Sequence, residues 1–147
     1  MIKRILKILV IFIVIGLILF IFIQFIPYGK NHINPPVVSE PNWDSQQTRD
    51  FAKRACFDCH SNETTWPWYS NVAPVSWLVY RDVVEGRQRL NFSNWQNSRL
   101  REPGEIASVI SEGEMPPFQY LPMHPTARLS SAEKNQFING LTSTLSR

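Results

Sequence analysis

The chain has 147 residues, with 15 Lys and Arg against 12 Asp and Glu, and a formal charge of +3. Four of the basic residues flank an apolar segment near the N-terminus: Lys3, Arg4, Lys7 and Lys30. Without these four, the rest of the chain holds 11 basic and 12 acidic residues. A nucleic-acid-binding domain needs a basic excess to neutralise phosphates. The charge pattern therefore argues against nucleic acid as a partner.

The apolar segment is an uncharged run of 19 residues, 8–26. As a helix rising 1.5 Å per residue it would be about 28 Å long, close to the hydrocarbon thickness of a bilayer. A cleaved signal peptide is the competing interpretation, but it usually has a shorter apolar region and small residues at a cleavage site. This run instead ends in Gln24-Phe25-Ile26-Pro27-Tyr28. We expect a basic tail over residues 1–7 and a transmembrane anchor over residues 8–27.

The charges beside this anchor also predict its orientation. Three basic residues precede the anchor and only Lys30 closely follows it. By the positive-inside rule, the N-terminus lies in the cytoplasm and the C-terminal domain lies in the periplasm or outside. Residues 28–43 are rich in proline and poor in large apolar residues, which is typical of a semi-extended linker. We expect this linker to hold a domain of residues 44–147 off the membrane.

The first half of this domain contains two helical patterns. Asp44 or Ser45 suits the N-cap of a helix that runs into Cys56. Pro74 suits the first position of a second helix, because the apolar residues among 75–83 lie mainly on one face. A Trp- and Pro-rich stretch, residues 65–69, lies between them and cannot form a regular helix.

The second half contains two more helical patterns after a loop at residues 91–98. Pro103 opens a helix that Gly113 would end. Ser130-Ser131-Ala132-Glu133 forms a capping box for a final helix, whose apolar face includes Phe137 and Leu141. Residues 114–125, with four prolines, are irregular. The sequence predicts an all-α fold of short helices separated by long, ordered loops.

Both cysteines of the chain lie in one motif, Cys56-Phe57-Asp58-Cys59-His60. This C-x-x-C-H spacing is the attachment signature of c-type haem. Two thiols separated by two residues near a helix end can reach two vinyl groups along one side of the porphyrin. The next residue brings its imidazole under the ring to ligate the iron. We therefore expect one covalent haem c held by Cys56 and Cys59, with His60 as an iron ligand.

Three other interpretations of the motif remain. A zinc site needs four ligands, and only His32 and His124 are left as distant nitrogen donors. A thioredoxin-like redox pair would lie in a βαβ context, which this sequence lacks. A plain disulfide, with His60 incidental, is the third. We favour haem, because bacterial c-type haem is attached outside the cytoplasmic membrane, where the charges place the domain.

The opposite side of the iron needs a second ligand in a low-spin electron carrier, usually Met or His. Met115 follows the third domain helix, and the two prolines after it fix the backbone. Met123 and His124 are alternatives, although we interpret His124 as a hydrogen-bonded structural residue. An open site is the remaining alternative, and it would permit peroxide or gas chemistry. We expect Met115 to ligate the iron.

Large aromatic residues are concentrated just after the motif. Each alone suits core packing, but together they could wall the porphyrin and donate to a propionate. We therefore include three tryptophans among the cofactor-binding candidates: Trp66, Trp68 and Trp77. Three arginines are candidates to pair with propionates: Arg81, Arg87 and Arg128.

These motifs together resemble small bacterial haem-binding domain proteins related to class I cytochromes c. The matching stretches are residues 56–64, 66–71, 73–78, 85–87, 90–93, 115–117, 120–121, 124–125 and 129–130. The resemblance implies covalent haem c, His60 as the proximal ligand, Met115 as the distal ligand, and a cytochrome c-like fold whose first and last helices cross. Small cytochromes often place Gly in the first helix at this crossing, but residues 45–55 contain none. Phe51 and Phe137 would then make the contact.

The sequence thus predicts a membrane-anchored mono-haem cytochrome c. It would transfer single electrons at the outer face of the cytoplasmic membrane to a redox partner protein there. The alternative function is that of an open-site haem protein with peroxidase or gas-sensing activity. We expect an electron carrier rather than an enzyme, because an iron with both axial positions filled keeps its ligands as it cycles between ferrous and ferric states.

Overall fold

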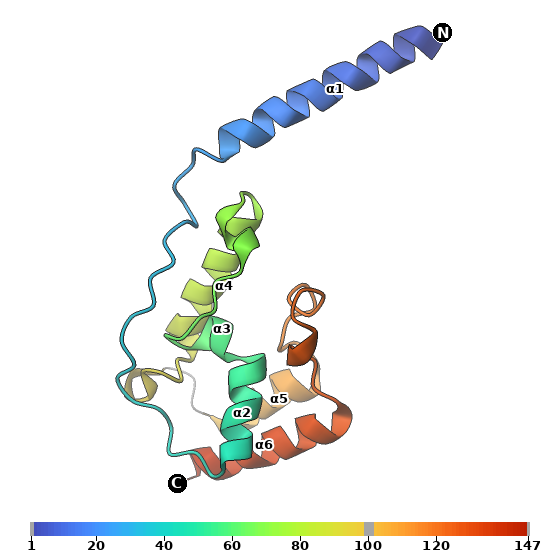
Figure 1. The fold of residues 1–147 in the computed structure, drawn as a ribbon. Helices are drawn as coiled ribbons and strands as arrows, with labels where there is room; N and C mark the ends of the chain where they lie inside the picture. The colour runs from blue at the N-terminus through green and yellow to red at the C-terminus, as the bar shows by residue number, and fades with distance from the viewer. Residues whose placement is uncertain (1, 99–101, 147) are drawn as a thin grey trace. The chain divides into compact units, whose positions relative to one another are not determined.

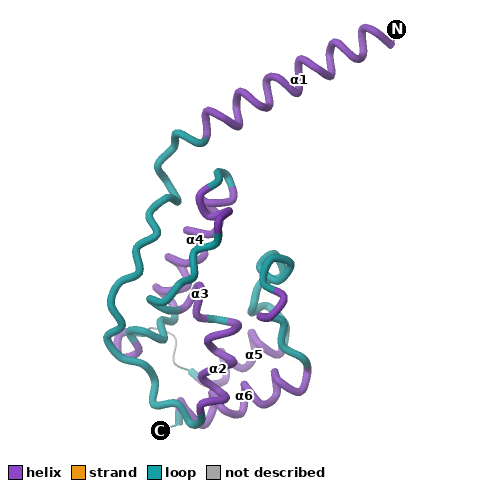
Figure 2. The backbone as a smooth tube through the Cα atoms, in the orientation of Figure 1, coloured by secondary structure: helices purple, strands orange, loops and turns teal. Residues whose placement is uncertain are grey.

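The computed structural model describes residues 2–98 and 102–146. Within these residues the chain is all-helical, with one isolated bridge and no strand, as the sequence predicts (Figure 2). The α-helices are α1 (Ile2–Ile23), α2 (Gln46–Ala55), α3 (Phe57–His60), α4 (Val75–Arg89), α5 (Pro103–Ser111) and α6 (Ser131–Leu145) (Figure 1). The 3-10 helices are η1 (Trp68–Asn71), η2 (Trp95–Asn97) and η3 (Pro125–Ala127).

The chain divides into two compact units. The first unit contains the chain up to His32 together with Trp66–Arg81. The second unit contains Ile33–Thr65 and the chain from Asp82 onward. Helix α4 begins in the first unit and ends in the second.

The longest element of the first unit is α1. Its 22 residues would extend about 33 Å, enough to cross a bilayer by length and composition, and none of its described residues is buried. The helix starts before the uncharged run and ends at Ile23, whereas the sequence led us to expect an anchor over residues 8–27. Lys and Arg are good helix formers, so the basic residues near the N-terminus extend the helix instead of ending it.

Part of the expected linker, residues 38–40, belongs to the second unit and is bonded to other residues of it. Ser39 forms the isolated bridge with Asn94, and Ser93 O accepts from the N–H groups of both Val38 and Ser39. The carboxylate of Glu40 forms an ion pair with Arg49 of α2 at 2.7 Å. These contacts involve backbone groups and a single pair of charges, which a proline-rich composition does not reveal.

The core of the second unit lies between α2, α5 and α6. Its buried members are Phe51, Ala52, Ala55, Phe57, Leu90, Phe92, Ile106, Ile110, Leu129, Phe137 and Leu141. The predicted contact between α2 and α6 is confirmed, since the rings of Phe51 and Phe137 meet edge to face with their centroids 6.0 Å apart. The glycine at this crossing lies in the last helix, where a Cβ on Gly140 would overlap the Thr48 hydroxyl.

The predicted ends of α2 and α6 are also confirmed. The Ser45 side chain accepts from Thr48 N at 3.2 Å and caps α2. At α6, Ser130 and Glu133 exchange both bonds of the capping box, with Ser130 N donating to Glu133 Oε2 at 2.7 Å. These side chains satisfy backbone N–H groups that the first helical turn leaves unpaired.

The two central helices follow the proline signals. Helix α5 has Pro103 in its first turn, and Gly113 beyond its end has a φ of 79°, which favours glycine. Helix α4 starts directly after Pro74 and continues past Gly86 to Arg89. A glycine inside a helix lowers its stability by about 1 kcal/mol relative to Ala, so some contact in the structure must require glycine at position 86.

Candidate functional site

The second unit contains a cavity of about 870 Å³. This is near the upper end of the range for small-molecule and cofactor sites, about 300–1,000 Å³. Much of its wall is apolar and comes from α5, α6 and the residues that follow α4: Leu90, Phe92, Ile106, Ile110, Phe137 and Leu141. The cavity therefore suits a large ligand with an apolar body.

The two cysteines and the histidine of the motif all line this cavity. Helix α2 ends at Ala55, and Cys56 leaves the helical conformation with a φ of −128°. The chain then makes one further turn, α3, in which His60 N donates to Cys56 O at 2.8 Å. The sequence predicted a single helix that ran into Cys56 and did not predict this turn. The turn brings Cys56, Cys59 and His60 to one cavity.

Glycine at position 86 allows α4 to approach the C-x-x-C-H motif closely. A Cβ at Gly86 would lie 2.5 Å from the carbonyl oxygen of Cys59. Any side chain there would push α4 away from the motif. The close approach also allows α4 to bond the adjacent histidine.

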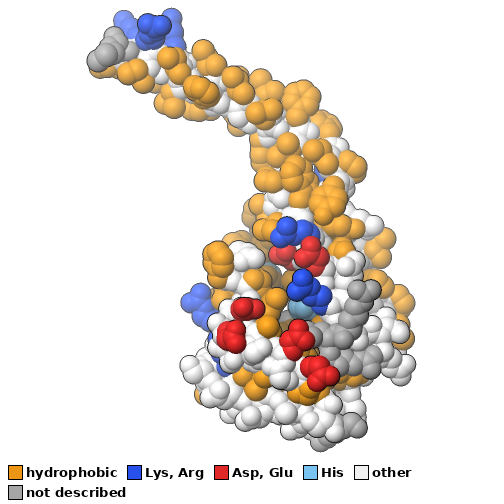
Figure 3. All heavy atoms as spheres, turned by 180° about the vertical axis from the view of Figure 1, so that it is seen from behind, with side chains coloured by type: hydrophobic (Ala, Val, Ile, Leu, Met, Phe, Trp, Pro, Cys, Tyr) orange, Lys and Arg blue, Asp and Glu red, His pale blue; other side chains and the backbone are white. Residues whose placement is uncertain are grey.

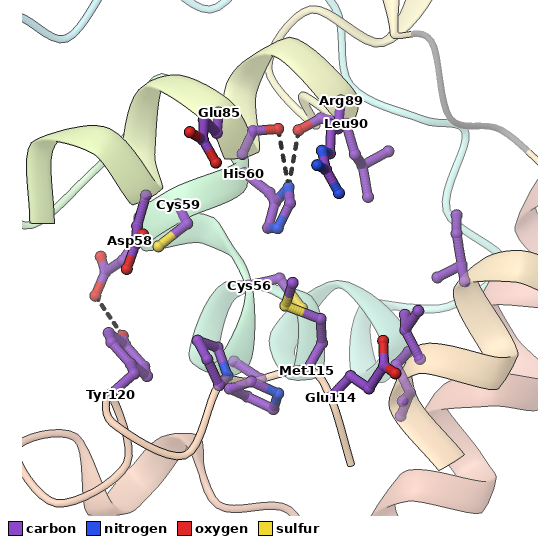
Figure 4. A pocket seen from close by; sticks show the side chains of 18 of the residues that line it. Cys56, Asp58, Cys59, His60, Glu85, Arg89, Leu90, Glu114, Met115 and Tyr120 are labelled. Atoms are coloured by element: carbon purple, nitrogen blue, oxygen red, sulfur yellow. Dashed lines mark hydrogen bonds between the residues drawn. The ribbon is translucent and has the colours of Figure 1, made fainter. Parts of the chain in front are cut away.

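The imidazole of His60 is oriented by two backbone carbonyls. Its Nδ1 lies 3.1 Å from Gly86 O and 3.1 Å from Leu90 O (Figure 4). Because both partners can only accept, we infer that Nδ1 carries the proton and Nε2 keeps a lone pair. Burial lowers the pKa of His60, which favours the neutral ring. A neutral imidazole held by its other nitrogen is the form in which histidine ligates metals.

The two cysteines are free thiols. Burial, together with the smaller effect of the nearby Cys59, raises the pKa of Cys56 to about 12. Burial also raises the pKa of Cys59 to about 12, with the charges of Asp82 and Asp58 acting in the same direction. Both thiols are therefore protonated at neutral pH. A thioredoxin-like nucleophile has a lowered pKa, so these cysteines lack that property.

Met115 lines the same cavity from the segment after α5. Its N–H donates to Val109 O at 3.0 Å, which ties it to the end of that helix, and its side chain is 36% exposed. In the view of Figure 4, His60 and Met115 enter the space from opposite sides. Met123 and His124 are not among the described residues that line it. Of the three distal candidates, the structure brings Met115 to the site.

His124 contributes to a structural contact beside the site, as its interpretation in the sequence suggested. Its ring stacks on Tyr120 with centroids 3.9 Å apart. The Tyr120 hydroxyl donates to the Asp58 carboxylate at 2.6 Å (Figure 4), and His124 Nδ1 lies 3.8 Å from the same oxygen. Asp58 belongs to the C-x-x-C-H motif, so this contact joins the segment after Met115 to the cysteines. The spacing of these residues in the sequence does not indicate this contact.

The three tryptophans proposed as cofactor-binding residues belong to the first unit. They are not among the described residues that line the cavity. Trp66 stacks on His32 with ring centroids 4.4 Å apart, and Trp68 is 73% exposed. Trp77 lies in the first half of α4, whereas the residues of α4 that line the cavity begin at Asp82. Proximity in sequence to the motif was therefore a poor guide to their position.

Among the described residues, Arg89 is the arginine that lines the cavity, and the sequence did not indicate it. The three candidates for propionate pairing do not line it among the described residues: Arg81, Arg87 and Arg128. The Arg87 guanidinium instead donates to Ser61 O at 2.8 Å and to Ile33 O at 3.0 Å. Arg89 lines the cavity, and its spacing from Gly86 places both on one helix face. The helical spacing of residues 86 and 89 could therefore have indicated Arg89 as a candidate.

The polar part of the lining is mainly acidic. Five carboxylates line the cavity together with Arg89: Asp58, Asp82, Glu85, Glu105 and Glu114. Acidic side chains gather around a hollow in the view of Figure 3. The cavity thus combines an apolar wall, polar groups, two thiols and one nitrogen donor. The apolar wall, the two thiols and the imidazole fit a flat apolar macrocycle with a metal at its centre.

A family model described as a haem-binding domain matches residues 18–143. The chain belongs to the haem-binding domain family. The match covers every described element of the cavity, from Ala55 to Leu141, so the predicted haem binding is confirmed at the level of the family. No curated protein and no solved structure matches this haem-binding domain.

Proposed function

We propose that this haem-binding domain attaches haem c covalently through Cys56 and Cys59 and serves as a one-electron carrier. The observation that carries the proposal is the state of His60. Its Nδ1 is held by Gly86 O and Leu90 O, which leaves Nε2 available beside two neutral thiols.

Each site residue has a distinct role in this proposal. Cys56 and Cys59 would hold the porphyrin through thioethers formed by addition of each S–H to a vinyl group. His60 would ligate the iron through Nε2, and Met115 would supply a thioether sulfur as the second ligand. When bound, the haem supplies an iron that cycles between the ferrous and ferric states. A Met ligand raises the reduction potential, and burial in the apolar cavity also tunes it.

We place this activity at the outer face of the cytoplasmic membrane. Helix α1 serves as the anchor, and the basic residues at its N-terminus favour a cytoplasmic N-terminus. The partner would be a second redox protein at the membrane, whose effective concentration the anchor raises. The crossing of α2 and α6 at Phe51 and Phe137 supports a relation to class I cytochromes c.

The covalent link is tested on the full chain, purified from cells competent in cytochrome c maturation. We expect a haem stain that survives a denaturing gel and a mass increased by one haem. Replacing both Cys56 and Cys59 by Ala should abolish the stain. An unmodified mass for the unsubstituted chain would refute covalent attachment.

The distal ligand is tested by carbon monoxide binding to the reduced protein. A six-coordinate iron should bind carbon monoxide only slowly, because Met115 must leave first, whereas Met115→Ala should bind it readily. Met123→Ala is the control, because Met123 lies outside the cavity lining, and it should behave like the unsubstituted protein. If the unsubstituted protein binds carbon monoxide as readily as Met115→Ala, the site is open. The peroxidase or gas-sensing function would then replace electron transfer.

A further inference from the structure

The C-terminal end of α1 is fastened to the rest of the first unit by the side chain of Gln24. Its Nε2 donates to Ala73 O at 2.9 Å, and its Oε1 accepts from Ala73 N at 2.9 Å. This pair of bonds mimics the pairing of two backbones. The same Nε2 donates to Phe20 O at 3.0 Å, within α1. One side chain thus joins the last turn of α1 to the segment Trp66–Arg81.

Two residues just beyond α1 contact the same segment. Gly29 has a φ of 79° and packs so closely that a Cβ would lie 2.7 Å from Ser76 O. The ring of Tyr28 meets Tyr80 edge to face, with centroids 5.4 Å apart. A larger residue at Gly29 would disturb both the backbone conformation and the contact.

His32 completes the attachment. Its ring stacks on Trp66, and its Nε2 lies 3.1 Å from Ser70 O. The residues from Gln24 to His32 therefore hold the segment Trp66–Arg81 against the end of α1 and leave it little freedom to move away.

The length of α1 sets the depth of this attachment in a membrane. The uncharged run of residues 8–26 would extend about 28 Å as a helix, close to the hydrocarbon thickness of a bilayer, about 30 Å. Gln24 lies near the C-terminal end of this run, and so near the level where the hydrocarbon ends and the lipid headgroups begin. A segment bonded to Gln24 is held at the same level.

The amino-acid composition of the segment Trp66–Arg81 suits the boundary between the hydrocarbon and the lipid headgroups. Residues 66–80 contain no charged residue and five Trp and Tyr residues. Trp and Tyr are enriched where the headgroups meet the hydrocarbon, because their rings are apolar and carry one polar group. Trp68 is largely exposed, and Val75 and Leu78 also expose apolar surface. In water this surface would be unfavourable, whereas at a bilayer interface it would be buried.

We propose that the segment Trp66–Arg81 is a second membrane contact, with Trp68 in the headgroup region of a phospholipid bilayer. The inference rests on the proposed membrane anchoring by α1. It replaces the expectation that a linker holds the domain off the membrane, because the first unit lies at the lipid surface. In this proposal Trp68 contacts lipid and not the porphyrin.

Photo-crosslinking of the full haem-loaded chain, in vesicles of phosphatidylcholine and phosphatidylglycerol, tests this inference. The photoreactive residue p-benzoylphenylalanine replaces Trp68, or Phe20 of α1, or Phe118. Phe118 is the matched control, since it is an aromatic residue of the second unit and is 82% exposed. The haem spectrum of each variant reports whether it has folded. We expect lipid adducts at positions 20 and 68, several-fold above the yield at position 118.

The outcomes separate the inference from the proposed anchor. Adducts at position 20, with equally low yields at 68 and 118, would overturn the second contact and leave the anchor intact. Equal, high yields at 68 and 118 would overturn it as well, because the contact would not be specific to the first unit. An absence of lipid adducts at position 20 would overturn the anchor and the second contact together.

Discussion

The side chain of His60 is oriented by main-chain atoms, so the ligand set depends on how closely α4 approaches the motif. The Cβ-free surface of Gly86 permits that approach and lets Gly86 O reach Nδ1. The position of the proposed iron ligand therefore depends on a glycine of the neighbouring helix.

Replacing Gly86 by Ala tests this dependence. The added methyl group would overlap the Cys59 backbone, and overpacking of this kind typically costs about 1–3 kcal/mol of unfolding free energy. We expect less covalent haem per chain and a lower thermal midpoint, measured by haem absorbance and circular dichroism.

The control is Gly104→Ala in the first turn of α5. A Cβ at Gly104 has no neighbour within 4 Å among the described residues. This variant should keep its haem content and be as stable as the unsubstituted chain or slightly more stable. Equal losses in both variants would show that the contact with Cys59 does not matter.

Tyr120 is expected to hold the segment that carries Met115. Tyr120→Phe removes the donor to the Asp58 carboxylate, and hydrogen bonds to charged groups contribute about 1.5–3 kcal/mol. We expect faster carbon monoxide binding by the reduced protein, because Met115 would leave the iron more easily. Tyr28→Phe is the control in the first unit and should leave this rate unchanged. An unchanged rate in Tyr120→Phe would separate the hydrogen bond from the distal ligand.

At this scale the sequence predicted the residues that have distinctive chemistry. The spacing of Cys56, Cys59 and His60 is typical of haem c attachment. The two prolines after Met115 restrict the backbone there. It did not predict Arg89 or the role of Gly86, because an ordinary residue type becomes part of a site only through the packing of two helices. The three tryptophans were assigned by their proximity in sequence, and the fold places them in the other unit.

At the scale of elements, α2 and α6 cross where Gly140 meets Thr48. Gly140→Ala should lower the free energy of unfolding by about 1–3 kcal/mol through overpacking. Combining it with Thr48→Ala should recover part of the loss, because that change removes the hydroxyl and methyl groups that the new Cβ meets. Denaturant unfolding of the two single variants and the double variant measures the coupling. Strictly additive losses would mean that the two residues do not constrain the crossing.

The hydrogen-bonded carboxylate of Glu133, in the N-terminal cap of α6, makes the free energy of unfolding depend on pH in the acid range. A hydrogen bond from Arg54 of α2, followed by bonds from Ser130, lowers the pKa of Glu133 from 4.5 to about 2. The folded chain thus favours the carboxylate, so its contribution is present above pH 4.5 and is lost as the pH falls towards 2. In acid titrations of the thermal midpoint, Glu133→Gln should show a shallower loss over this range.

Elements with their own end signals were predicted well. Ser45, Pro74, Pro103 and the capping box at Ser130 each mark a helix start within one residue of its position in the structure. The short helix α3 was not predicted, because one turn of four residues has no periodicity to detect. Its start depends on Cys56 leaving the helical conformation, which is a tertiary effect.

At the scale of the whole molecule, the basic residues at the N-terminus are expected to determine where haem can be attached. Replacing Lys3, Arg4 and Lys7 by Gln should weaken the orientation of α1 and leave more domains in the cytoplasm. We expect a smaller fraction of chains with covalent haem, measured by haem stain against total protein. Lys53→Gln, in the second unit, is the control. An unchanged fraction in the triple variant would remove the charge argument for topology.

The two carbonyls that accept from His60 lie at the C-terminal end of α4, where the peptide dipoles of a helix leave partial negative charge. As acceptors for Nδ1–H they would make Nε2 more electron-rich. If His60 and Met115 hold the iron as proposed, such a ring would favour the oxidised state, whereas a methionine sulfur would favour the reduced state. The reduction potential would then be set by a helix terminus on one side and a thioether on the other.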